Sequence, residues 1–309
     1  KQAGISNCFD NVYDQQGPDY FLKEVKRYFE GDDLTLVNLE GTISSLGEPD
    51  PNKKWRFRGD PEYLQILTGS SVEAVSFSNN HCRDYGEESY TDTMKNLEEA
   101  GILYSSEDIT AVTTVKGIKI GMLAVNSAFR AGDNANNKEY PNTRELMDII
   151  QACIDELKEQ EVQLIIASLH FGVESTSQVT SQQKQLAHFA IDQGADLVIG
   201  HHPHVLQGTE YYNGAYIAYS LGNFCFGGNT NPKNRDTVIW QQEFTFTDGA
   251  KTGQSVKLVP CLISSPKGRN NYQPITATGS AATRILGKMR RYSSAMGVTV
   301  GSDGTLTVK

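Results

Sequence analysis

Three of the six histidines of this chain lie within four positions, in the stretch VIGHHPHVLQG at 198–208. His201, His202 and His204 follow an apolar run that is typical of a buried strand. Imidazole binds metals and also exchanges protons near neutral pH. By themselves, these histidines are consistent with either a metal site or a polar turn, so the choice depends on what other strand ends contribute.

Similar side chains follow three other apolar runs. Glu40 follows LTLVNL, His170 follows VQLIIASL, and VEAVSFS leads into Asn79, Asn80 and His81. Each alone has an ordinary explanation, such as a solvated acid, a turn asparagine or a hydrogen-bonded histidine. However, ligands of open α/β sheets gather outside the carboxyl ends of strands, and five of the six histidines lie at three such ends. This convergence predicts a shared metal site.

The ligand types indicate the class of metal. Imidazole combined with carboxylate and amide oxygen, without thiolate, favours Mn, Fe or Zn over a structural zinc site. Ligands from several strands also suit two adjacent metals, which can hold the attacking and leaving oxygens of a phosphoryl transfer. A separate histidine that is not a ligand could protonate the leaving group. We therefore expect a divalent metal cofactor, with either one or two ions.

Alternating helices and strands are expected to position these residues. Helices are predicted at 18–30, 59–67, 84–101, 143–160, 181–194 and 280–297, and strands at 34–41, 72–81, 115–127, 162–172 and 195–204. Strands that are apolar on both faces imply a sheet covered by helices. The later strands alternate polar and apolar residues, which implies a second, more antiparallel sheet. We predict an α/β fold with helices outside two sheets, forming a single domain over 1–309.

The composition argues against several other classes of protein. A formal net charge of −9 is unusual for a nucleic-acid-binding protein. The five cysteines are scattered and lack a C-x-x-C pair, so we expect neither a disulfide framework nor a zinc–thiolate site. No apolar run is long enough to span a membrane, and the first residues lack the features of a signal peptide. We interpret Lys1 as lying downstream of the natural start of translation.

Five motifs resemble, in order, those of a known family. They are NLEG (38–41), SNNHCRDYG (78–86), LHFGVE (169–174), GHHPHVLQG (200–208) and YSLGNFCF (219–226). Together they resemble the CapA family of poly-γ-glutamate capsule-synthesis proteins, which is similar to the calcineurin-like metallophosphoesterases. The resemblance implies a four-layer α-β-β-α sandwich and a role in making or exporting a surface polymer at the cell surface. We expect the last motif to shape a turn beneath the site.

The resemblance also implies which residues bind the metals. Glu40 takes the position of a bridging acid, and Asn80 takes that of the ligand amide. His170 matches a lone histidine ligand. His202 and His204 match an H-x-H pair of ligands.

The remaining candidates are expected to surround these ligands. His81 matches the general acid of the family, and Asp84 either orients its imidazole or caps the helix that begins there. Glu174 is either a partner of a ligand histidine or a solvated loop acid. His201 and Asn79 are expected to contact the ligand residues without binding the metal themselves.

The chain departs from the family pattern at its start. Family members begin with a strand that ends in Gly-Asp, and the aspartate is a metal ligand. No such strand precedes Glu40, because Asp10 and Asp14 lie ahead of the first predicted helix with no apolar strand leading into them. We expect the strand, and a membrane anchor, to belong to a segment absent from 1–309. Its loss would leave one metal poorly held and a sheet neighbour unpaired.

Three functions remain open. The first is a metal-dependent hydrolase of phosphoesters or a related bond, outside the cytoplasm. The second is a capsule-assembly factor that binds an anionic polymer or a partner in the synthesis machinery at the membrane. The third is a structural surface protein with a vestigial site. The residues favour the hydrolase, whereas the resemblance favours the assembly factor.

Overall fold

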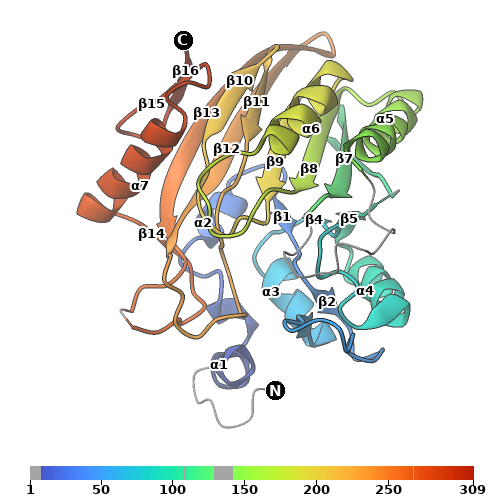
Figure 1. The fold of residues 1–309 in the computed structure, drawn as a ribbon, viewed down its shortest axis with the longest axis vertical. Coiled ribbons are helices and arrows are strands. Elements are labelled where there is room, and N and C mark those ends of the chain that lie inside the picture. Colours follow the sequence, from blue (N-terminus) through green and yellow to red (C-terminus); the bar gives the residue numbers. More distant parts are fainter. Residues whose placement is uncertain (1–7, 108, 129–141, 267) are drawn as a thin grey trace.

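The computed structural model describes residues 8–107, 109–128, 142–266 and 268–309. The described helices and sheets form four layers in the order α-β-β-α (Figure 1). The predicted α/β sandwich is therefore confirmed.

The first sheet has six strands, in the order β10-β11-β9-β8-β7-β6. The four inner strands run parallel and the two edge strands are antiparallel to their neighbours. The strand bounds are β6 Ala111–Val115, β7 Ile118–Asn126, β8 Leu164–His170, β9 Leu197–His201, β10 Thr209–Tyr212 and β11 Ala215–Ala218. Every residue of β8 is buried, as expected for a parallel strand that is covered on both faces.

Two helices cover the outer face of this sheet (Figure 1). They are α5 (Thr143–Glu159) and α6 (Ser181–Asp192), and each begins with a capping box. In the first box, Asn142 and Glu145 satisfy one another's backbone N–H groups. These caps fix the residues at which the two helices begin.

Two three-stranded sheets form the second β layer. One is parallel, in the order β1-β4-β5, and the other is antiparallel, in the order β12-β13-β14. Their bounds are β1 Leu36–Asn38, β4 Ala74–Ser76, β5 Leu103–Ser105, β12 Asp236–Thr247, β13 Ala250–Leu262 and β14 Ile275–Thr276. Leu36 and Leu258 pack with Ile166 of the first sheet, so the largest core lies between the two β layers.

Short helices cover the outer side of the second β layer. They are α1 (Phe9–Gln16), α2 (Lys26–Phe29), α3 (Leu64–Thr68) and α4 (Gly86–Glu99). The remaining elements are the pair β2 (Thr42–Ile43) and β3 (Arg58–Gly59), the helix α7 (Gly279–Tyr292), and the hairpin β15 (Val298–Val300) and β16 (Leu306–Val308). Helix α7 buries Ile285, Leu286 and Met289 against β12 and β13.

The sequence-based expectation for the first helix was wrong. The segment 18–30 contains only a 3₁₀ turn at Pro18–Tyr20 and the short α2, because Phe21 and Val25 are fully buried and tertiary packing overrides a regular helix. Asp10 and Asp14 lie within α1 rather than ahead of the first helix. The predicted last helix also ends early, at Tyr292, and the chain continues into β15.

Candidate metal centre

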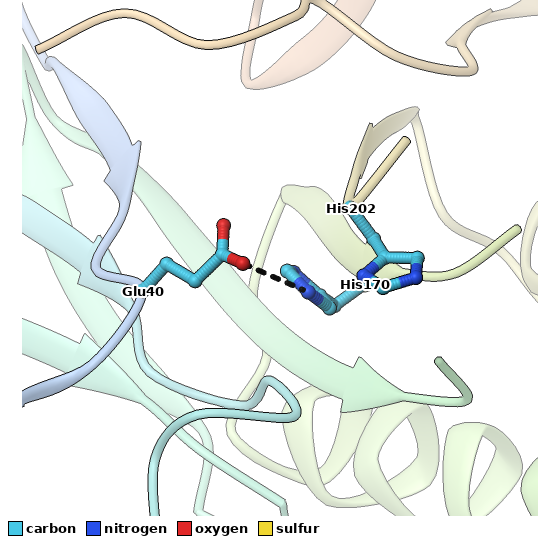
Figure 2. Close-up of side chains that lie close together, drawn as sticks. All are labelled: Glu40, His170 and His202. Carbon is cyan, nitrogen blue, oxygen red and sulfur yellow. Dashed lines mark ion pairs between the residues drawn. The ribbon is translucent and has the colours of Figure 1, made fainter. Parts of the chain in front are cut away.

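Glu40, His170 and His202 point toward one another at the carboxyl ends of strands from both β layers (Figure 2). Glu40 follows β1, His170 ends β8, and His202 follows β9. Each of the three offers one ligand atom, and these atoms all lie within 4.8 Å of one another. His170 and His202 meet because the neighbouring parallel strands β8 and β9 deliver their carboxyl ends to the same edge of one sheet, and Glu40 reaches them from the end of β1 in the facing layer.

A second group shares His202 with the first. It consists of Glu174, His202 and His204, whose ligand atoms also lie within 4.8 Å of one another. Glu40 connects the groups, because its Oε1 is 3.5 Å from His204 Nε2 and 3.8 Å from His170 Nε2. The arrangement thus brings together all the expected histidine ligands and the expected bridging acid.

Two asparagines tie the strand ends together. Asn79 Nδ2 donates to the carbonyl of Leu39 at 2.8 Å, and Asn79 Oδ1 accepts from the N–H of His81 at 3.0 Å. Asn80 Oδ1 lies 2.9 Å from His170 Nε2. Asn79 therefore holds the end of β4 against the end of β1, while Asn80 places its amide beside a ligand histidine.

His81 is fully buried and is held by a carboxylate. Its Nδ1 lies 2.6 Å from Asp84 Oδ2, and Asp84 also accepts from the N–H of Phe57 and from Lys53 Nζ. Burial raises the pKa of Asp84, but the hydrogen bond with His81 and the positive charges of His81 and Lys53 outweigh it, so this pKa lies below its usual value. Of the two roles considered for Asp84, the structure favours orientation of His81, because the cap of α4 is Tyr85.

Two of the ligand histidines have an unusual backbone conformation. His202 has φ of 96° and His204 has φ of 56°, values that a residue with a Cβ rarely adopts. His204 Nδ1 lies 2.8 Å from Asn223 Oδ1, which turns Nε2 toward Glu40. Strained backbone of this kind clusters at functional sites, where surrounding contacts maintain it.

The surroundings of His170 and His201 keep these two imidazoles neutral. Burial, followed by the positive charges of neighbouring histidines, holds the pKa of His170 well below its usual value. Burial alone lowers the pKa of His201 to about 4. His201 belongs to neither ligand group, although it lines the same cavity of about 1600 Å³ as Glu40, His202 and His204. Neutral imidazole is the form that binds metals.

The donors present fit a divalent metal. Among the described residues, the buried Glu40 Oε1 and His170 Nδ1 have no hydrogen-bond partner. Buried polar atoms in proteins are nearly always satisfied, so such atoms call for an ion or another ligand. The mixture of imidazole and carboxylate matches the preferences of Mn²⁺, Fe or Zn²⁺.

Two contributors to the site were missed in the sequence. Lys53 was not among the candidate residues, yet its Nζ contacts Asp84 Oδ1 and the carbonyl of Asn80, both at 2.8 Å. Asn223 lies in the SLGNF stretch, which we expected only to form a turn. The placement of Asn223 within a motif of the resemblance was the one available signal.

A known family matches most of this chain. The family described as Bacterial capsule synthesis protein PGA_cap matches residues 5–228, a span that contains every residue of the candidate site. The chain belongs to this family.

Two relatives in the family carry matching names. The chain is 28% identical over 229 residues to "Capsule biosynthesis protein CapA" of Bacillus anthracis, which covers 70% of this chain and 56% of that protein. It is 29% identical over 241 residues to "PGA biosynthesis protein CapA" of Bacillus subtilis (strain 168), covering 75% and 63%. The shared span is thus less than two thirds of either relative.

Similar solved structures are more distant. NAD nucleotidase from Haemophilus influenzae has 14% sequence identity and a TM-score of 0.38, covering 74% of this chain and 48% of that chain. GAP50 of Plasmodium has 13% identity and a TM-score of 0.37, covering 86% of both chains.

Within the described residues, no helix is long and apolar enough to cross a membrane.

Proposed function

We propose that this protein is a metal-dependent phosphoesterase-like enzyme that acts in the synthesis or export of a capsule polymer. The observation that carries the proposal is the meeting of Glu40, His170 and His202 beside the buried pair His81 and Asp84. Ligands for a metal and a positioned proton donor are the two parts that metal-assisted hydrolysis requires.

The two ligand groups define where metals would bind. Glu40, His170 and His202 would hold one ion, with Asn80 beside them, and the group around His204 would hold a second. A divalent metal, when bound, activates water and polarises a phosphoryl oxygen. The neutral imidazole of His170 and the half-buried carboxylate of Glu40 are suited to retain such an ion.

His81 is suited to proton transfer. Its Nδ1 is engaged by Asp84, which fixes the orientation and the tautomer of the ring. Transfer to a leaving oxygen would then involve Nε2. Lys53 and the N–H of Phe57 keep Asp84 in place, so the imidazole does not have to reorganise during the reaction.

The substrate is expected to be anionic. Lys54, Arg56 and Arg58 line the same cavity as Glu40 and His204. In a chain with a net charge of −9, this local group of cations offsets repulsion of a phosphoester or an anionic polymer. The names of the relatives support a capsule polymer as the setting, at the cell surface and with the synthesis machinery as partner.

Metal analysis and hydrolysis test the proposal together. We expect the full-length protein to bind Mn, Fe or Zn by mass spectrometry and to hydrolyse an aryl phosphate in the presence of Mn²⁺. His202→Ala should lose both properties. His188→Ala is the matched control, because His188 pairs with Glu210 and stacks on Tyr212 outside the ligand groups. Full-length protein with no metal and no turnover would refute the proposal.

A non-catalytic assembly factor is the second candidate. The two ligand groups of the described residues contain the carboxylates Glu40 and Glu174 and no aspartate, and Glu174 is exposed. Asp10, which precedes Glu40, is 2.6 Å from the hydroxyl of Tyr63 instead. If immobilised poly-γ-glutamate retains the protein equally well with and without His202→Ala, and no hydrolysis occurs, this candidate is favoured.

A further inference from the structure

One long segment of this acidic chain contains no acidic residue. Between Gly249 and Ser302 the sequence has eight lysines and arginines and no aspartate or glutamate, in a chain whose formal net charge is −9. The segment includes helix α7, and it lies outside residues 5–228, the span that the family matches. A separation of charge of this extent indicates a surface for a negatively charged partner.

Three cations of α7 form a stripe along the helix. Arg284, Lys288 and Arg291 follow one another at intervals of four and three residues, which places them on one face, about 5–6 Å apart. Arg291 is exposed, and the side chains of Arg284 and Lys288 keep 50% and 28% of their exposure. The neighbouring face, with Ile285 and Met289, is buried against β12 and β13, beside which α7 lies in Figure 1. Packing therefore fixes the direction of this cationic stripe.

Two cations of the stripe share one carboxylate. Asp236 is buried, and it accepts from Arg284 Nη2 at 2.6 Å and from Lys288 Nζ at 2.7 Å. Burial raises the pKa of Asp236, but the hydrogen bonds and the charges of the two cations outweigh it, so this pKa lies below its usual value. One negative charge cannot neutralise two positive charges, so the group keeps a net positive charge.

A small polar pocket adjoins Lys288. Its volume is about 150 Å³, and it is lined by Lys288, Tyr292, Asn234, Ser175, Ser177, Val205 and Leu206. These described residues contribute ammonium, hydroxyl and amide groups, and none of them carries a carboxylate. All of these polar groups can donate hydrogen bonds, which are shortest and strongest when the acceptor is an anion.

The pocket is next to the candidate metal centre. Ser175 directly follows Glu174, and Val205 directly follows His204, so the pocket shares two loops with the second ligand group. The N–H of Ser175 also donates to the carbonyl of Pro203 at 2.8 Å, which joins the two loops. A chain molecule that places one unit in the pocket can therefore present a neighbouring unit to the metal centre.

Buried side chains hold the loop that supplies the two serines. Gln207 Nε2 donates to the carbonyls of Thr176 and Gln178, at 3.1 Å and 3.0 Å. Its Oε1 accepts from Nε2 of Gln183 in α6 at 2.8 Å, and both glutamines are buried. A loop that is ordered before binding loses less entropy when a ligand arrives.

We propose that the pocket and the cationic stripe bind an anionic polymer, with one carboxylate of the polymer in the pocket and further carboxylates along α7. The helix has 14 residues and is about 20 Å long, enough for several units of an extended polymer. The identity of the polymer, poly-γ-glutamate, rests on the proposed function. The binding itself requires no hydrolysis.

Binding of labelled poly-γ-glutamate to the full-length protein, measured by fluorescence anisotropy, tests the proposal. We expect Lys288→Gln with Arg291→Gln to weaken binding about tenfold at low salt, and the difference should shrink above about 0.15 M salt. Because Lys288 also holds Asp236, Ser177→Asp is a second test variant. It adds a negative charge to the pocket without removing either partner of Asp236, and it should weaken binding to a similar extent.

The matched control is Lys26→Gln with Lys95→Gln. It removes the same charge as the double variant, from two lysines that each pair with a glutamate four residues further on. Its affinity for the polymer should equal that of the unmodified protein. An equal loss in the control would assign the effect to net charge and overturn the proposal, as would unchanged binding by both test variants.

Two further measurements separate this proposal from its alternatives. Sedimentation with phosphatidylglycerol vesicles tests a membrane surface, and we expect no binding. Vesicle binding that is lost in the same test variants would assign the cationic stripe to a membrane and overturn the proposal. Hydrolysis of an aryl phosphate is measured on the same samples. Absence of turnover in the unmodified protein would refute the proposed enzyme, whereas polymer binding that depends on Lys288 and Arg291 would still support the polymer site.

Discussion

At the scale of single residues, the ion pair of Lys53 with Asp84 links a surface loop to a buried imidazole. Asp84 is fully buried, while the Lys53 side chain keeps 18% of its exposure. We expect Lys53→Met to lower the free energy of unfolding by about 2 kcal/mol, since it removes hydrogen bonds to a charged group. Urea denaturation measures the change. Lys54→Met is the control, because Lys54 stacks on the exposed Trp55. Equal stabilities of the two variants would contradict this role.

His170 gives a pH dependence whose sign can be worked out. Its pKa in the folded protein lies well below 6.5 because of burial first and neighbouring positive charge second. The unfolded chain therefore binds the proton more readily, so the contribution of His170 to stability is present above about pH 6.5 and declines as the pH falls below that value. We expect the unfolding free energy of the metal-free protein to fall between pH 7 and 5 more steeply than that of His170→Gln. Parallel pH profiles would show that His170 titrates normally.

At the scale of elements, the close approach of β9 and β11 sets the position of the histidine turn. A Cβ at Gly200 would lie 2.2 Å from the carbonyl oxygen of Tyr219 and 2.5 Å from the ring of Phe171. We expect Gly200→Ala to destabilise the protein by about 1–3 kcal/mol, because backbone must move to relieve the overlap. Since His201 follows directly, metal binding should weaken as well.

Gly287→Ala is the matched control for this substitution. A Cβ at Gly287 meets no atom within 4 Å, and the residue lies inside α7. Replacement there should stabilise the protein by about 0.5–1 kcal/mol, because glycine is unfavourable in a helix. Urea denaturation of both variants distinguishes the effects. If both substitutions shifted stability in the same direction, the steric explanation of Gly200 would fail.

The metal ligands at the strand ends could be predicted from the sequence because each depends only on a short local pattern. An apolar run followed at once by a ligand, as in VQLIIASLH or LTLVNLE, places that ligand at a sheet edge without knowledge of the rest of the fold. The burial of β8 and the positions of α5 and α6 follow from the same local patterns. The bounds of β8, α5 and α6 were accordingly predicted to within about two residues.

The parts that could not be predicted depend on contacts distant in sequence. Lys53 reaches Asp84 from 31 residues away, and the loop that carries it has no periodic pattern. Helix α1 is held by aromatic contacts, such as that of Phe9 with Phe21 and that of Tyr13 with Tyr63, rather than by strong helix propensity. The positive φ of His202 likewise depends on tertiary contacts, so the local sequence does not predict it.

At the scale of the whole molecule, the protein is acidic, yet three cations close in sequence line the same cavity as Glu40 and His204 of its candidate metal centre. Lys54, Arg56 and Arg58 line the cavity there, in a chain of net charge −9. Attraction between exposed charges is screened over about 8 Å at physiological salt, so its contribution should depend on ionic strength.

The proposed anionic substrate can therefore be tested through this dependence. We expect a double variant, Lys54→Gln with Arg56→Gln, to weaken inhibition by inorganic phosphate about three- to tenfold at low salt, and the difference should shrink above about 0.15 M salt. The control carries a charge change of the same kind far from the cavity: Lys95→Gln, on the exposed side of α4, where Lys95 pairs only weakly with Glu99 at 3.7 Å. Both variants make the acidic protein more negative, so an effect of net charge alone would appear in both. An effect confined to the double variant and removed by salt assigns the attraction to Lys54 and Arg56. A salt-independent loss would instead indicate that the loop has been displaced from the site.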